Sequence, residues 1–138
     1  MPEISNIKGL EQARASFAFQ CANSVSKKTG KKPKEYKSYA KKLPMMIKTN
    51  GLGAALAFAF SKGKDGNAWE ILYNDVKSWL QQDQKKFLLG NHASNELVEA
   101  VIKLESPHYR AVTVEVLAFL NWLRRFAEGL IDGEAEEN

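Results

Sequence analysis

Apolar residues recur at intervals of three and four in one segment after another, and this spacing most constrains what the chain can fold into. Between residues 5 and 25 the series is Leu10, Ala13, Phe17, Cys21 and Val25. The spacing places these side chains on one face of an α-helix, because a helix turns once every 3.6 residues. No stretch alternates apolar and polar residues for long, and no Asn-Gly or Asp-Gly pair separates two β-branched runs. The sequence therefore predicts an all-α protein.

Two further helices are expected in the first half of the chain. Residues 34–48 place their apolar side chains on one half of a helical wheel, and Asn50 and Gly51 are typical of a helix end because both tolerate a left-handed backbone. Pro44 lies inside this helix, and since it lacks an amide hydrogen we expect it to kink or restart the helix. Residues 52–61 are expected to form a short buried helix.

The second half of the chain is expected to contribute three more helices. Asn67 is a good cap for the first, Ser94 for the second, and Ser106, followed by a proline, for the last. The last helix should reach about Ile131, over roughly 39 Å at 1.5 Å per residue. Its middle is apolar nearly all round, so it lies at the centre of a bundle or has a partner on its second face. We expect a single helical domain, residues 1–138, with about five to six helices and a long C-terminal helix.

The amino-acid composition limits the number of domains and the cellular compartment that can be expected for this chain. A chain of 138 residues with 44% apolar residues suits one domain with its own core. The single cysteine, Cys21, excludes an internal disulfide and a cysteine-based zinc site, and it is typical of a reducing compartment. The N-terminus lacks the features of a signal peptide, and the uncharged run at 52–60 is too short to span a bilayer. We expect a soluble, cytoplasmic protein with no membrane contact.

Charge is unevenly distributed, although the net charge is only +4. Nine lysines and a single acid, Glu35, lie between residues 27 and 48, whereas residues 132–138 hold four acids and no base. Such separation indicates a surface that faces a polyanion. The basic linker at 27–33 and the acidic tail at 132–138 are both expected to be flexible.

Four lysines share one face of the 34–48 helix, opposite its apolar side. Lys34, Lys37, Lys41 and Lys48 fall within an arc of roughly 60° at about 100° per residue, and we call them the lysine stripe. Ammonium groups spaced over roughly 20 Å can follow a sugar–phosphate backbone, each releasing counterions on contact. The competing interpretation is a solvated face, but a face that serves only solubility usually mixes charges of both signs. The stripe therefore favours contact with nucleic acid.

Arginines of the last helix could extend this surface. They are Arg110, Arg124 and Arg125, of which the last two could instead pair with Glu128.

Motifs of catalytic and cofactor sites are missing. Gly51 and Gly53 lack the third glycine of a dinucleotide fingerprint and the Gly-Lys-Ser/Thr of a P-loop, so a helix end and a close helix approach are the expected roles. His92 and His108 could run acid–base RNA cleavage, but nothing in their spacing brings them together. Clusters with metal-ligand spacing are absent as well. We expect no enzyme, cofactor, metal or small-molecule substrate.

Two blocks of sequence resemble a known family: the small all-helical subunit, the fifth, of the type III-B CRISPR effector called the Cmr complex. The first is YAKKLPMMIKTNGLG, residues 39–53, with the alanine-rich helix that follows. The second is YRAVTVEVLAFLNWLRRFA, residues 109–127. The resemblance covers most of the chain, and the linker KKTGKKPK and the acidic tail fall outside the pattern.

The resemblance implies a non-catalytic protein that stacks in a few copies inside a ribonucleoprotein. It would line the groove where CRISPR RNA pairs with target RNA, so its implied partners are the backbones of both RNAs, other subunits and further copies of itself. Together with the lysine stripe, the resemblance predicts RNA contacts by Lys34, Lys37, Lys41, Lys42, Lys48, Arg110 and Arg125. The alternative is a small helical DNA-binding regulator, which requires base-reading residues on an exposed recognition helix.

Overall fold

The computed structural model describes residues 2–82 and 86–134, and these residues form an all-α fold, as predicted. The helices are α1 (Pro2–Ser26), α2 (Lys32–Asn50), α3 (Leu52–Lys62), α4 (Ala68–Leu80), the 3₁₀ helix η1 (Lys86–His92), α5 (Leu97–Ile102) and α6 (Ser106–Leu130). The long C-terminal helix is present as well. Within the described residues, no helix is both long and apolar enough to cross a membrane.

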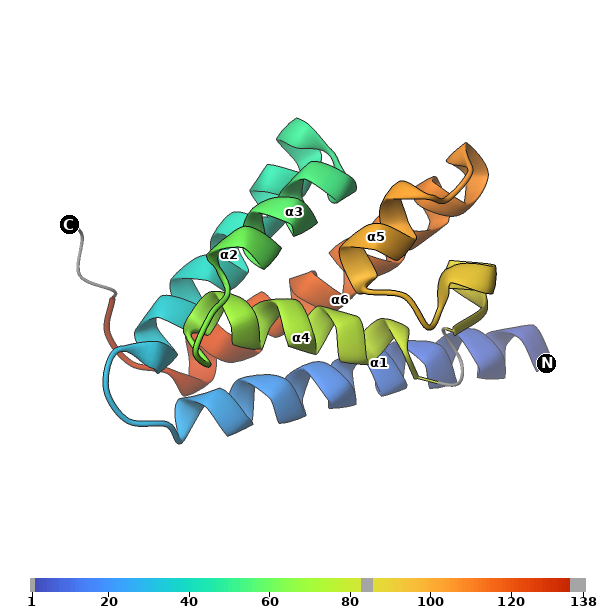
Figure 1. Cartoon of the computed structure of the whole chain (residues 1–138). Coiled ribbons are helices and arrows are strands. Elements are labelled where there is room, and N and C mark those ends of the chain that lie inside the picture. The colour runs from blue at the N-terminus through green and yellow to red at the C-terminus, as the bar shows by residue number, and fades with distance from the viewer. Residues whose placement is uncertain (1, 83–85, 135–138) are drawn as a thin grey trace.

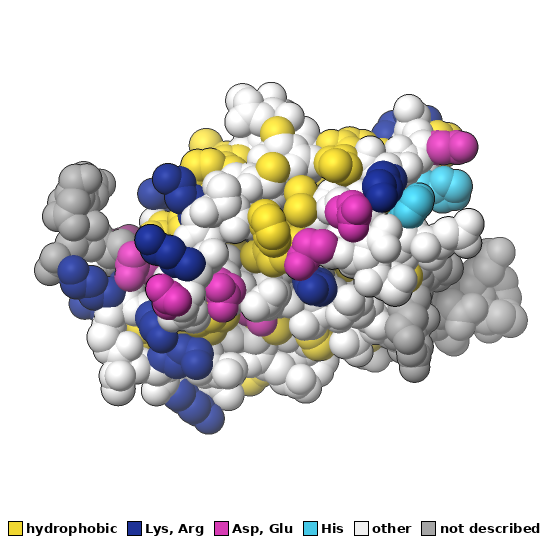
Figure 2. Space-filling view, viewed as in Figure 1, with side chains coloured by type: hydrophobic (Ala, Val, Ile, Leu, Met, Phe, Trp, Pro, Cys, Tyr) yellow, Lys and Arg dark blue, Asp and Glu magenta, His cyan; other side chains and the backbone are white. Residues whose placement is uncertain are grey.

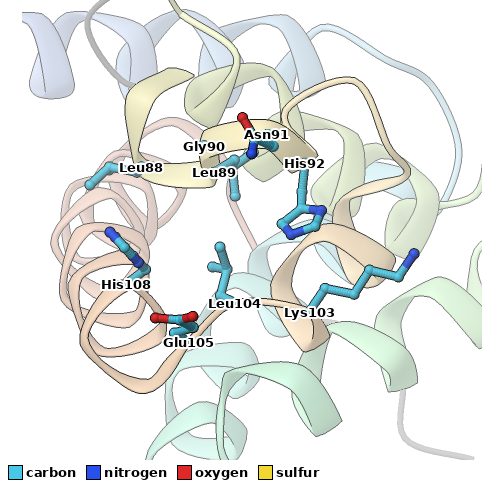
Figure 3. A pocket seen from close by; sticks show the side chains of 9 residues that line it. All are labelled: Leu88, Leu89, Gly90, Asn91, His92, Lys103, Leu104, Glu105 and His108. Carbon is cyan, nitrogen blue, oxygen red and sulfur yellow. The ribbon is translucent and has the colours of Figure 1, made fainter.

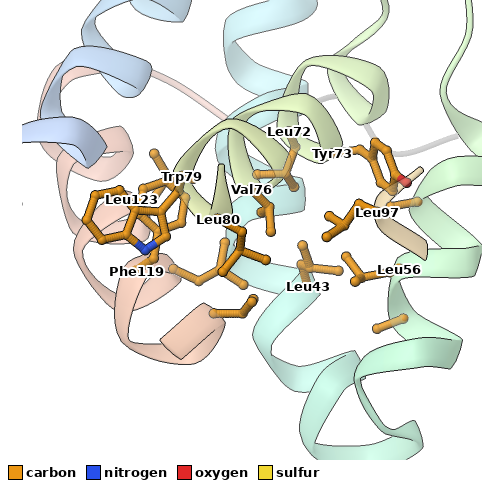
Figure 4. Close-up of a cluster of buried hydrophobic side chains, with 14 of the residues drawn as sticks. Leu43, Leu56, Leu72, Tyr73, Val76, Trp79, Leu80, Leu97, Phe119 and Leu123 are labelled. Atoms are coloured by element: carbon orange, nitrogen blue, oxygen red, sulfur yellow. The ribbon is translucent and has the colours of Figure 1, made fainter. Parts of the chain in front are cut away.

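Helix α6 is the centre of the bundle, because it packs against both α1 and α2 (Figure 1). Helices α2 and α3 form a hairpin, and α4 packs across both of them. The central position of α6 explains much of the apolar sequence in its middle, although Val114 is 68% exposed. Trp79 of α4 stacks on Phe119 of α6 with ring centroids 5.7 Å apart, close to Leu123 (Figure 4). Leu43 of α2 and Leu80 of α4 complete this part of the core with no exposed surface.

A buried ion pair joins α1 to α6 inside the core. Glu115 is only 7% exposed, and its carboxylate accepts hydrogen bonds from Nε and Nη2 of Arg14 at 2.8 and 3.0 Å. The indole Nε1 of Trp79 donates to the same carboxylate at 3.0 Å. Because a buried charge is costly unless it is paired and hydrogen-bonded, these three side chains from three helices stabilise one another.

The start of α2 differs from the prediction. The helix begins at Lys32, so the connection after α1 is shorter than the predicted linker at 27–33. Pro33 lies in the first turn, where a missing amide hydrogen costs nothing and the fixed φ suits a helix. Helix α2 also runs through Pro44 without a restart. Of the predicted tail at 132–138, residues 135–138 lie outside the described residues.

Helix caps were predicted with mixed success. Asn67 caps α4 as predicted, accepting a hydrogen bond from the Glu70 amide at 3.0 Å. The predicted cap Ser94 is wrong: α5 starts at Leu97, and Glu96 is its cap, because the Glu96 carboxylate accepts from the Leu97 amide at 3.0 Å. At α6 the cap position is Glu105, so Ser106 is the first helical residue.

The two blocks of the family resemblance meet at the end of α2. Gly51 has a φ of 92°, which ends the helix as predicted. The Gly53 amide donates to the hydroxyl oxygen of Tyr109 at 2.8 Å, and a Cβ on Gly53 would lie 3.4 Å from Ile102 and from that oxygen. A Cβ at 3.4 Å would make ordinary van der Waals contacts, so the close helix approach predicted for Gly53 does not itself require glycine there. The Gly53 amide is used by the fold.

Candidate nucleic-acid interface

The outer sides of α2 and α6 meet in a groove that is open to solvent. Contacts at the two ends of the pair show that the helices run antiparallel: Lys37 bonds to Ile131 at one end, and Gly53 to Tyr109 at the other. The groove has a volume of about 520 Å³. Its lining residues are Lys41, Pro44, Met45, Lys48, Leu117, Ala118, Asn121 and Arg124, and we call it the α2–α6 groove.

An apolar floor separates the basic side chains of the groove. Met45 is 67% exposed, and Leu117 lies opposite it on α6. Val114 of α6 is 68% exposed and lies one turn before Leu117 along the helix. Met45 and Leu117 line the same groove, and accessible apolar side chains grouped in this way indicate a surface that contacts a ligand or partner.

Three cations border this floor. Lys41 and Lys48 are exposed, and among the described residues neither forms an ion pair. Arg124 donates to Oδ1 of Asn121 at 3.5 Å and lies 4.0 Å from the carboxylate of Glu128, the pairing considered from the sequence. At that distance and exposure the pair is weak, so Arg124 keeps most of its positive potential toward solvent.

Lys34 and Lys37 lie beyond the groove, next to the end of α6. The Lys37 ammonium donates to the carbonyl oxygens of Ile131 and Gly133 at 3.0 and 2.7 Å, and it lies 3.7 Å from a carboxylate oxygen of Glu134. The lysine stripe is thus divided: the Lys37 side chain is only 15% exposed, whereas Lys41 and Lys48 face the groove.

The remaining predicted RNA contacts do not line the groove. Lys42 lies 5.8 Å from the centre of the Tyr39 ring, on the side of α2 where Tyr39 stacks on Trp69 of α4. Arg110 and Arg125 are exposed on α6. Arg124, which was not among the predicted RNA contacts, does line the groove. Its signal in the sequence is the spacing 110, 114, 117, 121, 124, which marks one outer face of α6.

Positive charge is also uneven on the face of the molecule formed by α4. In Figure 2, Lys and Arg side chains gather toward the end that carries the α1–α2 connection, whereas hydrophobic side chains are exposed over α3. Phe58 and Phe60 of α3 are exposed large hydrophobic residues. Both basic and apolar surface are therefore localised in patches.

The two histidines line one pocket, a proximity that nothing in their sequence spacing predicted. His92, at the end of η1, and His108, in the first turn of α6, line a pocket of about 340 Å³ with Lys103 and Glu105 (Figure 3). Their imidazoles lie on opposite sides of the pocket, with Leu104 between them. Within the described residues, no group of three His, Cys, Asp or Glu side chains could hold a metal ion.

A second titratable cluster lies under α4. The Tyr36 hydroxyl donates to Oδ2 of Asp75 at 2.7 Å, and burial raises the pKa of Asp75 to about 6 although Tyr36, Cys21 and Lys28 favour its charged form. Burial and the Asp75 charge raise the pKa of the Cys21 thiol well above its usual value, which suits a small core residue and not a nucleophile. The hydrogen bond between Tyr36 and Asp75 therefore has a structural role, because it joins α2 to α4.

Fold and groove together define a small helical protein with one basic, partly apolar groove between α2 and α6. The sequence model of the family described as CRISPR-associated protein (Cas_Cmr5) matches residues 10–130. The chain belongs to this family. The match confirms the resemblance found in the sequence, and it includes the α1–α2 connection, which the resemblance had left outside the pattern.

Similar proteins from Thermus thermophilus agree with this assignment. The protein described as CRISPR system Cmr subunit Cmr5 is 36% identical over 121 residues, which are 88% of this chain and 95% of the relative. The crystal structure of a CRISPR-associated Cmr5 family protein from the same organism matches with a TM-score of 0.71 and 35% identity, covering 88% of this chain and 96% of that one. The shared fold therefore spans nearly the whole of both proteins.

Proposed function

We propose that this chain is a non-catalytic, RNA-contacting small subunit of a cytoplasmic type III-B CRISPR effector, the Cmr complex, and that the α2–α6 groove contacts the sugar–phosphate backbone. Family membership supports a place in the complex. The observation that carries the RNA contact is the grouping of Lys41, Lys48 and Arg124 from two antiparallel helices around one groove.

The dimensions of the groove suit a phosphate backbone. Lys41 and Lys48 are seven residues apart, about 10 Å along α2. Phosphates of one strand follow each other at about 3.4 Å along the axis of a duplex, so the two ammonium groups span roughly three phosphates. Arg124 adds a guanidinium from the opposite wall, and a guanidinium can bind phosphate in a bidentate manner. Such contacts carry no sequence information, which suits a subunit that must accept any guide and target.

Exposed apolar side chains outside the groove support the second part of the proposal, contact with other subunits and with further copies of this chain. Val114 of α6 and Ile102 of α5 would leave water on assembly, and burial of apolar surface is the main driving force of protein association. Each copy would then continue the basic path of its neighbour.

The proposal is tested by neutralising the groove with Lys41→Gln, Lys48→Gln and Arg124→Gln together. A matched control carries Lys62→Gln, Lys64→Gln and Lys103→Gln, which change the net charge equally but lie at the end of α3, in the loop after it and just after α5. Binding of a fluorescent single-stranded RNA is followed by anisotropy from 50 to 200 mM salt. We expect the groove variant to bind at least about tenfold more weakly, with a salt slope reduced by about 2 to 3, roughly one for each lost phosphate contact.

Equal RNA affinity of the groove variant and the control would overturn the proposed contact. Circular dichroism of both proteins shows whether the helices are intact. Duplex DNA of the same length serves as a competitor, and preferential binding of one DNA sequence would favour the helical DNA-binding regulator instead.

A further inference from the structure

We propose that the C-terminal segment 131–134 regulates RNA access to the α2–α6 groove, by holding Lys37 and placing a carboxylate where the RNA backbone would otherwise continue along α2. This inference rests on the proposed RNA contact. It concerns the half of the lysine stripe that lies outside the groove.

The segment is fixed to the fold at two points. Ile131 is 4% exposed and belongs to the core, which positions the residues that follow. Lys37 then holds the backbone through the two hydrogen bonds to the carbonyl oxygens of Ile131 and Gly133. An ammonium group with two such acceptors has little capacity left for a phosphate, because it has only three hydrogens to donate.

Gly133 lets the chain turn over the lysine stripe. Its φ of 82° is a conformation that other residues rarely adopt, and a Cβ at this position would lie 3.0 Å from Cε of Lys34. The backbone therefore lies directly against the Lys34 side chain. Glu134 follows and places its carboxylate 3.7 Å from the Lys37 ammonium. The same segment thus contacts both lysines at this end of the stripe, covering Lys37 and leaving Lys34 exposed.

The location of Glu134 makes it a competitor for phosphate. Lys41, which opens the α2–α6 groove, is one turn along α2 from Lys37, about 6 Å at 1.5 Å per residue. Glu134 already holds the Lys37 ammonium, so its carboxylate occupies the place where the phosphate next to the one at Lys41 would bind. Asp132, in the same segment, adds a second negative charge. RNA must end at Lys41 or displace the segment to reach Lys37.

The test neutralises the acids and leaves the anchoring carbonyl groups in place. One full-length variant carries Asp132→Asn and Glu134→Gln; its control carries Glu99→Gln and Glu105→Gln, which change the net charge equally and lie in α5 and just before α6. Binding of a fluorescent single-stranded RNA is measured at 50 and 200 mM salt. We expect the tail variant to bind about three- to tenfold more tightly than the control at 50 mM salt, with a smaller difference at 200 mM.

The outcomes separate this inference from the proposed function. If the tail variant and its control bind RNA with equal affinity, the segment does not compete and the inference is overturned, while the groove contact stands. If wild type and both variants all fail to bind RNA at 50 mM salt, the RNA contact itself is wrong and the inference falls with it. Thermal unfolding followed by circular dichroism establishes that all three proteins are folded.

Discussion

The two flanks of α6 use charge in opposite ways. Toward α1, Glu115 is buried and takes hydrogen bonds from Arg14 and Trp79. Toward α2, Lys41 and Arg124 face a groove that is open to solvent. Helix α6 thus presents one charge that the fold needs, Glu115, and one that faces solvent in the groove, Arg124. The comparison shows that in this protein a charged residue is a candidate for ligand binding only where the neighbouring helices give it no strong hydrogen-bond or ion-pair partner.

The largest effect is expected on the α1 side, from Glu115→Ala. The change leaves the Arg14 guanidinium and the Trp79 indole without their shared acceptor. Breaking a buried pair costs about 3–5 kcal/mol, and we expect the lower end of that range because Arg14 keeps its ion pair with Glu11. Urea unfolding measures the loss in the free energy of unfolding. Glu99→Ala removes an exposed pair with Lys103 and is the matched control, with an expected loss below about 0.5 kcal/mol. Equal losses for the two variants would contradict the contrast between the two flanks.

A second, intermediate effect is expected for the dependence of stability on pH. Because burial raises the pKa of Asp75 to about 6, the folded state binds more protons than the unfolded state between pH 4 and 6. The contribution of Asp75 to the free energy of unfolding therefore falls as the pH rises through this range, by at most about 3 kcal/mol at 1.4 kcal/mol per pKa unit. Asp75 is partly exposed, and solvent screening makes its actual contribution to the free energy of unfolding smaller than this upper limit.

Asp75→Asn isolates this contribution. The amide oxygen of the new side chain can still accept from the Tyr36 hydroxyl, but it does not titrate. We expect the stability of the variant relative to wild type to rise between pH 4 and 7, as measured by urea unfolding at several pH values. Glu99→Gln, at an exposed position, is the control. A constant difference between Asp75→Asn and wild type over this range would show that Asp75 ionises normally in the folded protein.

The smallest effect is expected on RNA affinity, when two lysines of the lysine stripe are replaced separately. Lys41→Ala should weaken RNA binding several-fold, because its ammonium faces the groove with no ion-pair partner among the described residues. Lys37→Ala should weaken it less or not at all, since the Lys37 ammonium is already bound to segment 131–134. Anisotropy with a fluorescent RNA at 50 mM salt measures both. A greater loss for Lys37→Ala than for Lys41→Ala would show that the stripe acts as a whole.

Helices were predictable from the sequence because their apolar spacing is a local property. The all-α fold, the end of α2 at Gly51 and the cap at Asn67 all follow from residues close in the chain. The errors were at boundaries where two local signals compete: Pro33 suits a first helical turn as well as a linker, and the Glu96 side chain took the cap that Ser94 could have supplied.

The candidate site was predictable only in part. Lys41 and Lys48 were correctly placed on an outer face of α2. Arg124 was not chosen, because its proximity to Lys41 depends on the antiparallel packing of α2 and α6, which no local pattern specifies. The meeting of His92 and His108 in one pocket was missed for the same reason, since it depends on how η1 packs against α6.

By itself the sequence determined the helices, their apolar faces, the excess of lysine between residues 27 and 48, and the family. All of these depend on residue type and on short-range spacing along the chain. Only the tertiary structure decided which cations are available to a ligand. Lys37 and Lys41 are one turn apart and chemically identical, yet the chain end at 131–134 covers one while α6 forms a groove beside the other. Availability depends on neighbours that are distant in the sequence, and those are set by how the helices pack.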